Sequence, residues 1–148
     1  MKIGDAFQGI NKVFLDTSPV IYYVEATPGY AIVAQEVFKL LSQGSFEAVV
    51  SPVTLAECLV IPIRLGQAKS QQNFIDMLTN TDGISFVPIT PAVSQEAALM
   101  RVRYGLKLPD ALQVATALVA GCDAFLTNDA ALQRVTELRI IVLGALEI

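Results

Sequence analysis

The sequence predicts an α/β fold, a three-layer sandwich in which helices cover both faces of a mostly parallel five-stranded sheet. Three observations lead to this prediction. Short apolar segments alternate along the chain with longer segments of helical periodicity. The short segments are apolar at successive positions, which is typical of parallel strands buried on both faces. With 148 residues, of which 53% are hydrophobic, the chain has the size and composition of one domain with a substantial core.

Five segments are expected to be strands, because each is short, apolar and bounded by polar or turn-forming residues. They are residues 13–15, 46–50, 84–89, 124–127 and 140–143. The first ends at Asp16, and the fourth is followed by Asn128 and Asp129.

Helices are expected between these strands. The first covers residues 30–43, where an apolar stripe of helical spacing stops at Gly44. The second opens with Ser51 as N-cap and Pro52 as first helical residue, and we expect Pro62 to kink or end it. The remaining helices are expected at residues 70–79, 92–104, 109–121 and 130–136.

Composition excludes several classes of function. Histidine is absent, which excludes histidine metal sites and Ser-His-Asp triads. No apolar run approaches the ~18 residues of a membrane helix, and the first residues have no signal-peptide core, so a cytoplasmic protein without a membrane contact is expected. Cys58 and Cys122 are expected to be buried free thiols. No repeat or linker divides the chain, so residues 1–148 are expected to form a single domain.

Four carboxylates are expected to meet at one edge of the sheet. Asp16 and Asp129 follow strands, Glu57 lies in the helix after the second strand, and Asp110 lies just inside a helix start. In parallel sheets, ligands bind outside the carboxyl ends of the strands. Each aspartate alone also fits a helix cap or the positive end of a helix dipole.

The two helices that carry Glu57 and Asp110 are unusually apolar. Glu57 is surrounded in sequence by apolar residues almost all round its helix, where an unpaired charge is costly. Almost no polar face remains on the helix that starts near Asp110, so we expect this carboxylate at the floor of a cleft. Clustered carboxylates repel one another, and oxygen-only ligands favour Mg²⁺ or Mn²⁺, which can assist phosphodiester hydrolysis.

The segments that contain these carboxylates resemble, in order, the motifs of the PIN domain family, most closely the VapC-type toxin ribonucleases of toxin–antitoxin modules. The segments are Leu15-Asp16-Thr17-Ser18, Leu55-Ala56-Glu57, Pro109-Asp110-Ala111-Leu112-Gln113-Val114-Ala115-Thr116-Ala117-Leu118 and Leu126-Thr127-Asn128-Asp129. The resemblance covers a core of about residues 12–143.

The resemblance implies strand order 3-2-1-4-5 and Mg²⁺- or Mn²⁺-dependent endonucleolytic cleavage of RNA. It implies that Asp16, Glu57, Asp110 and Asp129 are both catalytic and metal-binding. Thr127 is the expected supporting hydroxyl, and Ser18 and Asn128 are further supporting candidates. The resemblance also implies a cognate antitoxin, for which we expect a basic side chain at the carboxylates and apolar anchors near residues 59–63.

Two alternatives to the ribonuclease stay open. One is a PIN-like binding module without catalysis. The other is a phosphatase-like α/β hydrolase of phosphoesters; a haloacid-dehalogenase-type enzyme would need a second Asp where this chain has Ser18. A phospho-accepting receiver domain is disfavoured, because Leu143 and Gly144 stand where it needs a Lys.

Charge and hydropathy also bear on partners. Net charge is −4, so RNA must meet a local basic patch or bound cations. Arg101, Arg103 and Lys107 precede Asp110 and are candidates to line an RNA path. The high apolar content predicts a homodimer, with residues 59–63 as a candidate face. The eleven residues before Lys12 have no predicted role.

Overall fold

The computed structural model describes residues 1–148 and contains a single five-stranded sheet of order β3-β2-β1-β4-β5. All four strand pairs are parallel, which confirms the predicted α/β fold class and strand order. The strands are β1 (Lys12–Leu15), β2 (Glu47–Val50), β3 (Ile84–Phe86), β4 (Ala124–Thr127) and β5 (Arg139–Val142).

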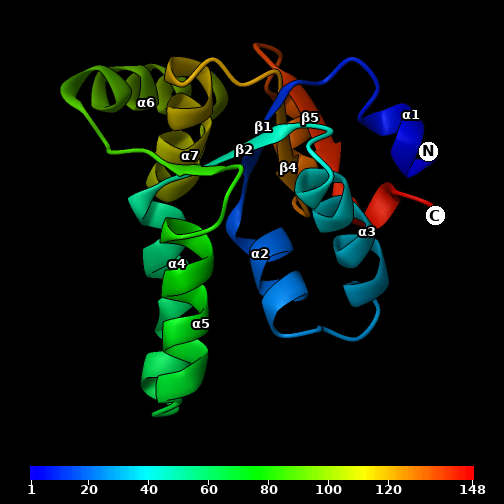
Figure 1. The fold of residues 1–148 in the computed structure, drawn as a ribbon. Helices are drawn as coiled ribbons and strands as arrows, with labels where there is room; N and C mark the ends of the chain where they lie inside the picture. The colour runs from blue at the N-terminus through cyan, green and yellow to red at the C-terminus, as the bar shows by residue number, and fades with distance from the viewer.

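Helices cover both faces of this sheet (Figure 1). The α-helices are α1 (Ile3–Ala6), α2 (Thr17–Val24), α3 (Ala31–Ser42), α4 (Pro52–Arg64), α5 (Ala68–Thr79), α6 (Pro91–Tyr104) and α7 (Leu108–Val119). Two short 3₁₀ helices, η1 (Ala130–Arg134) and η2 (Leu143–Ala145), flank β5. None of these helices combines the length and the apolar character needed to cross a membrane.

Alternating side chains of the central strands build two separate cores. Phe14 and Phe125 face α6 and α7, where their rings stack with centroids 5.1 Å apart. Val13 and Leu15 face the opposite layer, which is built from the first five helices. Both cores are fully buried at β1 and β4, as expected for parallel strands apolar on both faces. The centre of the sheet is therefore a rigid base for the residues that follow β1 and β4.

Several helix boundaries differ from the sequence predictions. The helix α2 was not predicted, because Ser18-Pro19 suggested a turn; Pro19 lies in the first helical turn, where a missing N–H costs no intrahelical bond. The helix α4 continues through Pro62 to Arg64. Pro62 is buried and lines the same cavity as Phe74, so packing compensates for the lost hydrogen bond.

The last elements also differ in detail. The strand β3 ends at Phe86 and does not reach residue 89. The segment after β4 forms a 3₁₀ helix. Both cysteines are free thiols as expected, but only Cys58 is buried, whereas Cys122 is half-buried.

The residues before β1 pack against the end of the chain. The backbone N–H of Ile3 donates to the carbonyl of Glu147 at 3.0 Å, and the N–H of Glu147 donates to the carbonyl of Met1 at 2.8 Å. Phe7 stacks on Phe46 with ring centroids 5.1 Å apart. The two termini therefore lie side by side (Figure 1), and the first residues extend the core on the α3 side.

Candidate functional site

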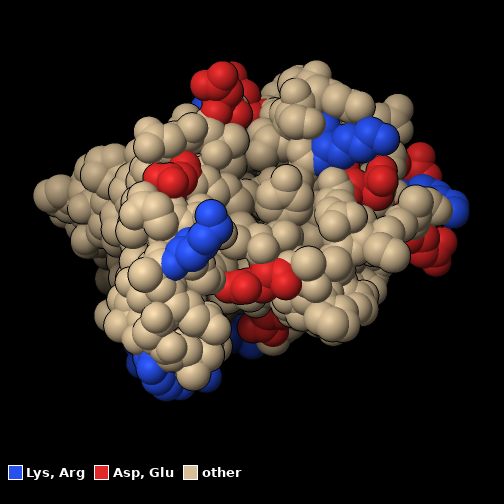
Figure 2. Space-filling model, turned by 60° about the horizontal axis from the view of Figure 1, so that its bottom comes forward, with Lys and Arg blue, Asp and Glu red and all other residues tan.

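Four carboxylates from four different elements lie at the carboxyl edge of the sheet. Asp16 and Asp129 occupy the N-cap positions of α2 and η1; Asp16 directly follows β1, and Asp129 lies two residues after the end of the neighbouring strand β4. Asp110 lies in the first turn of α7, and Glu57 lies in α4. Figure 2 shows acidic side chains in a hollow near the middle of this face, with Lys and Arg side chains standing singly around it.

Asp16 is the buried member of the cluster, with only 8% of its surface exposed. Its Oδ1 accepts a hydrogen bond from the backbone N–H of Thr17 at 2.9 Å, and its Oδ2 accepts one from Thr127 Oγ1 at 2.8 Å. Burial raises the pKa of Asp16 to about 6, against these two hydrogen bonds, and the charges of Asp110 and Glu57 raise it further. The Asp16 carboxylate is thus oriented by two hydrogen bonds, while its burial disfavours the charged form.

Asp110 and Glu57 complete the cluster from the helices. Asp110 is half-buried; its desolvation, followed by the charges of Asp129 and Glu57, raises its pKa. Glu57 Oε1 accepts a hydrogen bond from Thr17 Oγ1 at 2.7 Å. From the sequence, the charge of Glu57 was expected to be costly because of apolar neighbours in its helix. This expectation is wrong, because the Glu57 side chain is exposed, as are the neighbouring Val60 and Ile61 side chains.

Asp129 is exposed and also serves as a helix cap. Its Oδ1 accepts a hydrogen bond from the N–H of Ala131 at 3.0 Å. Its own N–H donates to Thr127 Oγ1 at 3.0 Å. Thr127 therefore links Asp16 to Asp129, at the position where the resemblance implies a supporting hydroxyl.

The other two supporting candidates differ from Thr127. Ser18 makes no side-chain hydrogen bond, so its assignment rests on its position alone. Asn128 donates to the hydroxyl of Tyr22 at 3.0 Å and accepts from the N–H of Gly144 at 2.9 Å. These bonds tie Asn128 to α2 and η2, and it contacts none of the four carboxylates through a hydrogen bond.

A buried polar network lies behind the site, and the sequence analysis did not predict it. Gln113 is fully buried in α7, accepts a hydrogen bond from Ser51 Oγ, and donates to Thr54 Oγ1 at 2.8 Å. The network joins α7, which carries Asp110, to the start of α4, which carries Glu57. The available signal was a lone glutamine in an otherwise apolar helix face, where a buried amide needs partners.

The donor set suits a hard divalent cation. All four side chains offer oxygen, the ligand that Mg²⁺ and Mn²⁺ prefer, and the pKa of Asp16 is raised by burial and, to a smaller extent, by the charges of Asp110 and Glu57. No group of three Asp, Glu or Cys side chains converges closely enough to form a ready metal site. The four carboxylates are nevertheless close, because the charges of Asp110 and Glu57 raise the pKa of Asp16, and those of Asp129 and Glu57 raise the pKa of Asp110.

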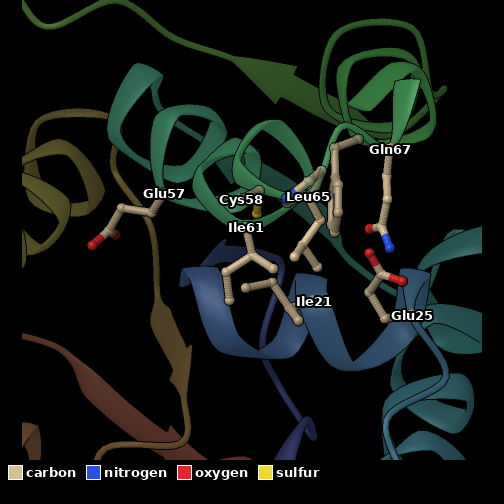
Figure 3. A pocket seen from close by; sticks show the side chains of 9 residues that line it. Ile21, Glu25, Glu57, Cys58, Ile61, Leu65 and Gln67 are labelled. Carbon is tan, nitrogen blue, oxygen red and sulfur yellow. The ribbon is translucent and has the colours of Figure 1, made fainter. Parts of the chain in front are cut away.

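An apolar groove begins beside the carboxylate cluster. It has a volume of about 280 Å³ and lies between α2, α4 and α5. Ile21 of α2 and Ile61 of α4 face each other across it, and the Glu57 carboxylate points away from the apolar side chains (Figure 3). Cys58 lines the groove, but burial raises the pKa of this thiol to about 12, so it is not a reactive thiolate.

The chain is similar to a known family and to several solved structures. The family model described as PIN domain matches residues 13–138. A VapBC2 complex from Rickettsia felis bound to promoter DNA has a chain that superposes with a TM-score of 0.69 at 14% identity, covering 88% of this chain and 98% of that one. A toxin–antitoxin complex from Klebsiella pneumoniae gives a TM-score of 0.69 at 18% identity, with coverages of 88% and 97%.

A third similar structure is VapC20 of Mycobacterium tuberculosis, described as a toxin that cleaves the sarcin-ricin loop. Its TM-score is 0.63 at 16% identity, and the match covers 76% of this chain and 86% of that one. At these low sequence identities, the similarity to the three solved structures shows a shared fold only. No curated protein sequence matches the chain significantly.

Proposed function

The chain belongs to the PIN domain family, and from that membership we propose that it is an Mg²⁺- or Mn²⁺-dependent endoribonuclease that hydrolyses RNA phosphodiester bonds. The observation that carries the proposal is the carboxylate cluster itself. Four acids from four elements lie at the sheet edge where ligands bind, and one of them is buried with its pKa raised to about 6. Such an arrangement costs stability unless a cation compensates it.

Asp16, Glu57, Asp110 and Asp129 would hold the ions and are the proposed catalytic residues. When bound, such ions supply positive charge that activates water and stabilises the leaving oxygen of a phosphodiester. Thr17 orients two of the carboxylates, through its N–H on Asp16 and its hydroxyl on Glu57. Thr127 fixes the second oxygen of Asp16 and the backbone of Asp129. These hydrogen bonds keep the acids oriented before substrate arrives, which lowers the cost of organising the site.

A cleavage assay tests this proposal. Wild-type protein should cleave RNA with Mg²⁺ or Mn²⁺ and stop when EDTA is added. Asp110→Asn should abolish cleavage with an unchanged circular dichroism spectrum. Asp82→Asn is the matched control, because Asp82 is exposed and makes no side-chain hydrogen bond. An Asp110→Asn variant that cuts RNA at the wild-type rate would refute the assigned role, and a wild-type protein that binds metal without cleaving RNA would favour the binding-module alternative.

We further propose that the protein is the toxin of a type II toxin–antitoxin pair and acts in the cytoplasm. The support is the PIN domain together with the fold shared with toxins in VapBC complexes. A free ribonuclease would damage its own cell, so a partner must inhibit it. The apolar groove and the adjoining acids suit an antitoxin segment with apolar anchors and a basic side chain near Glu57.

The antitoxin contact is testable through the antitoxin's own sequence. A small neighbouring reading frame for a DNA-binding protein with a basic or aromatic tail is expected. Reversing the charge of the basic residue in that tail should restore cleavage while the complex persists, because the apolar anchors remain. Unchanged inhibition after every basic tail residue is replaced by Ala would mean that inhibition is steric.

The proposed homodimer face is the exposed part of the predicted segment 59–63 on α4, in which Pro62 is buried and Leu59 half-buried. Val60 and Ile63, which are 49% and 59% exposed, lie with Ala56 on a helix face next to the stripe that lines the groove. Exposed apolar rows of this kind usually mark interfaces. Light scattering should give a dimer mass that Ile63→Lys lowers to the monomer mass. A monomeric wild-type protein would contradict this assignment.

A further inference from the structure

Several basic side chains already make hydrogen bonds or ion pairs within the protein. Of the three residues expected to line an RNA path, Arg101 donates to the carbonyl of Leu106 at 2.6 Å. Arg103 forms the single salt bridge of the chain, with Glu137 at 2.5 Å. Lys107 remains, and its side chain makes neither a hydrogen bond nor an ion pair.

Arg134 is the second free cation beside the carboxylates. It is the last residue of η1, the helix that Asp129 caps, while Lys107 occupies the N-cap position of α7, whose first turn holds Asp110. Both side chains are exposed, and Arg134, like Lys107, has no hydrogen bond or salt bridge. Both charges act to lower the pKa of Asp110, although neither contacts its carboxylate within 4.0 Å. Lys107 and Arg134 thus lie near the carboxylate cluster without forming an ion pair with any of its members.

We propose that Lys107 and Arg134 bind phosphates of the RNA strand beside the carboxylate cluster. The proposal rests on the ribonuclease function proposed above and names the residues that hold its substrate. A polyanion approaching four carboxylates is repelled, and the chain as a whole has a net charge of −4. Free cations on the two elements that carry Asp110 and Asp129 are therefore the local attraction that an RNA strand requires.

Two lysines elsewhere provide matched controls. Lys39 and Lys69 are exposed and lie on α3 and α5, neither of which carries a carboxylate of the site. If overall charge governed RNA binding, replacing these lysines would weaken it as much as replacing Lys107. If the positions of the charges matter, only Lys107 and Arg134 should respond.

The experiment measures binding and cleavage of a short fluorescein-labelled single-stranded RNA. Anisotropy titrations at several KCl concentrations use the Asp110→Asn background to prevent cleavage, and initial rates with Mn²⁺ use the otherwise unchanged chain. Lys107→Gln and Arg134→Gln should each raise Kd and KM several-fold and reduce the slope of log Kd against log [salt] by about 0.7, and the double variant by about 1.4. The value of kcat should change less than about twofold, because the lost phosphate contacts stabilise the bound substrate and the transition state equally.

Further measurements distinguish a role of Lys107 and Arg134 in RNA binding from a role in folding. Lys107→Arg and Arg134→Lys should restore the salt slope, and the rise in Tm caused by Mn²⁺ should be the same in all four variants. Lys39→Gln and Lys69→Gln should leave Kd, KM and the slope unchanged. Wild-type cleavage combined with unchanged slopes and KM would overturn this inference and leave the ribonuclease in place. If the wild type does not cleave RNA but the Gln variants still reduce the slope of log Kd against log [salt], the ribonuclease proposal is rejected and the RNA contacts are retained. If the protein does not bind RNA at all, both proposals are rejected.

Discussion

Replacing Asp16 by asparagine should stabilise the metal-free protein at alkaline pH. The pKa of Asp16 is raised from 3.8 to about 6, so the folded protein binds this proton more tightly than the unfolded chain does. The resulting stability is fully present below about pH 3.8 and is lost as pH rises through about 6. A difference of about two pKa units corresponds to about 3 kcal/mol. The asparagine amide would mimic the protonated acid but lose part of the hydrogen bonding, at about 1 kcal/mol, so a net gain of about 2 kcal/mol is expected.

Urea and thermal unfolding in EDTA measure this effect. At about pH 8, Asp16→Asn should raise Tm by roughly 4–8 °C, whereas at about pH 5 much of the advantage should vanish because the wild-type acid is then largely protonated. Comparing the two proteins at each pH removes the contributions of other titrating groups, and Asp82→Asn should follow the wild type. A variant that is no more stable than wild type at the alkaline pH, or a stability difference independent of pH, would refute the reasoning.

Three further predictions concern the same site. Mg²⁺ or Mn²⁺ at a concentration about 100-fold above its Kd should stabilise the wild type by about 2.7 kcal/mol in thermal unfolding, an effect that EDTA reverses; an unchanged Tm at all concentrations would argue against a metal site. Thr127→Val removes the hydroxyl that lowers the pKa of Asp16, so it should destabilise the protein by about 1–3 kcal/mol. It should also shift the acidic limb of the pH–rate profile of cleavage to higher pH, whereas the control Thr127→Ser, which keeps a hydroxyl, should not. Gln113→Leu leaves the Ser51 and Thr54 hydroxyls short of a partner and should cost about 1–3 kcal/mol in urea unfolding; a variant as stable as wild type would show that this network contributes little.

The sequence predicts the sheet well because buried parallel strands have a strong local signature. All five strands lie in the predicted segments, although β3 ends at Phe86, and Asp16 and Asp129 follow β1 and β4 as predicted. The strand order agrees with the order that the family resemblance implies. Helix boundaries were harder to predict, since they depend on tertiary packing. Pro62 stays inside α4 because its ring is buried in the groove, which no local pattern indicates.

The side-chain environment of the site was predicted less completely. Sequence spacing places Glu57 and Asp110 near the cluster, but the exposure of Glu57 depends on which stripe of α4 faces solvent. Asn128 stands between Thr127 and Asp129 in sequence yet bonds to Tyr22 and Gly144, because successive residues leaving a strand point in opposite directions. The pairing of Gln113 with Ser51 and Thr54 spans about sixty residues and is visible only in three dimensions.

The hydrogen bond between Thr127 and Asp16 joins residues 111 positions apart, and it has a consequence for the timing of synthesis. At a translation rate of about 5–20 residues per second, roughly 6–22 s separate the appearance of the two side chains on the ribosome. Until β4 emerges and pairs with β1, the nascent chain has no partner for the second oxygen of Asp16 and no Asp129. Truncated products that end before β4 are therefore expected to be inert, and a newly made molecule becomes competent only when its last quarter has folded onto the central strand.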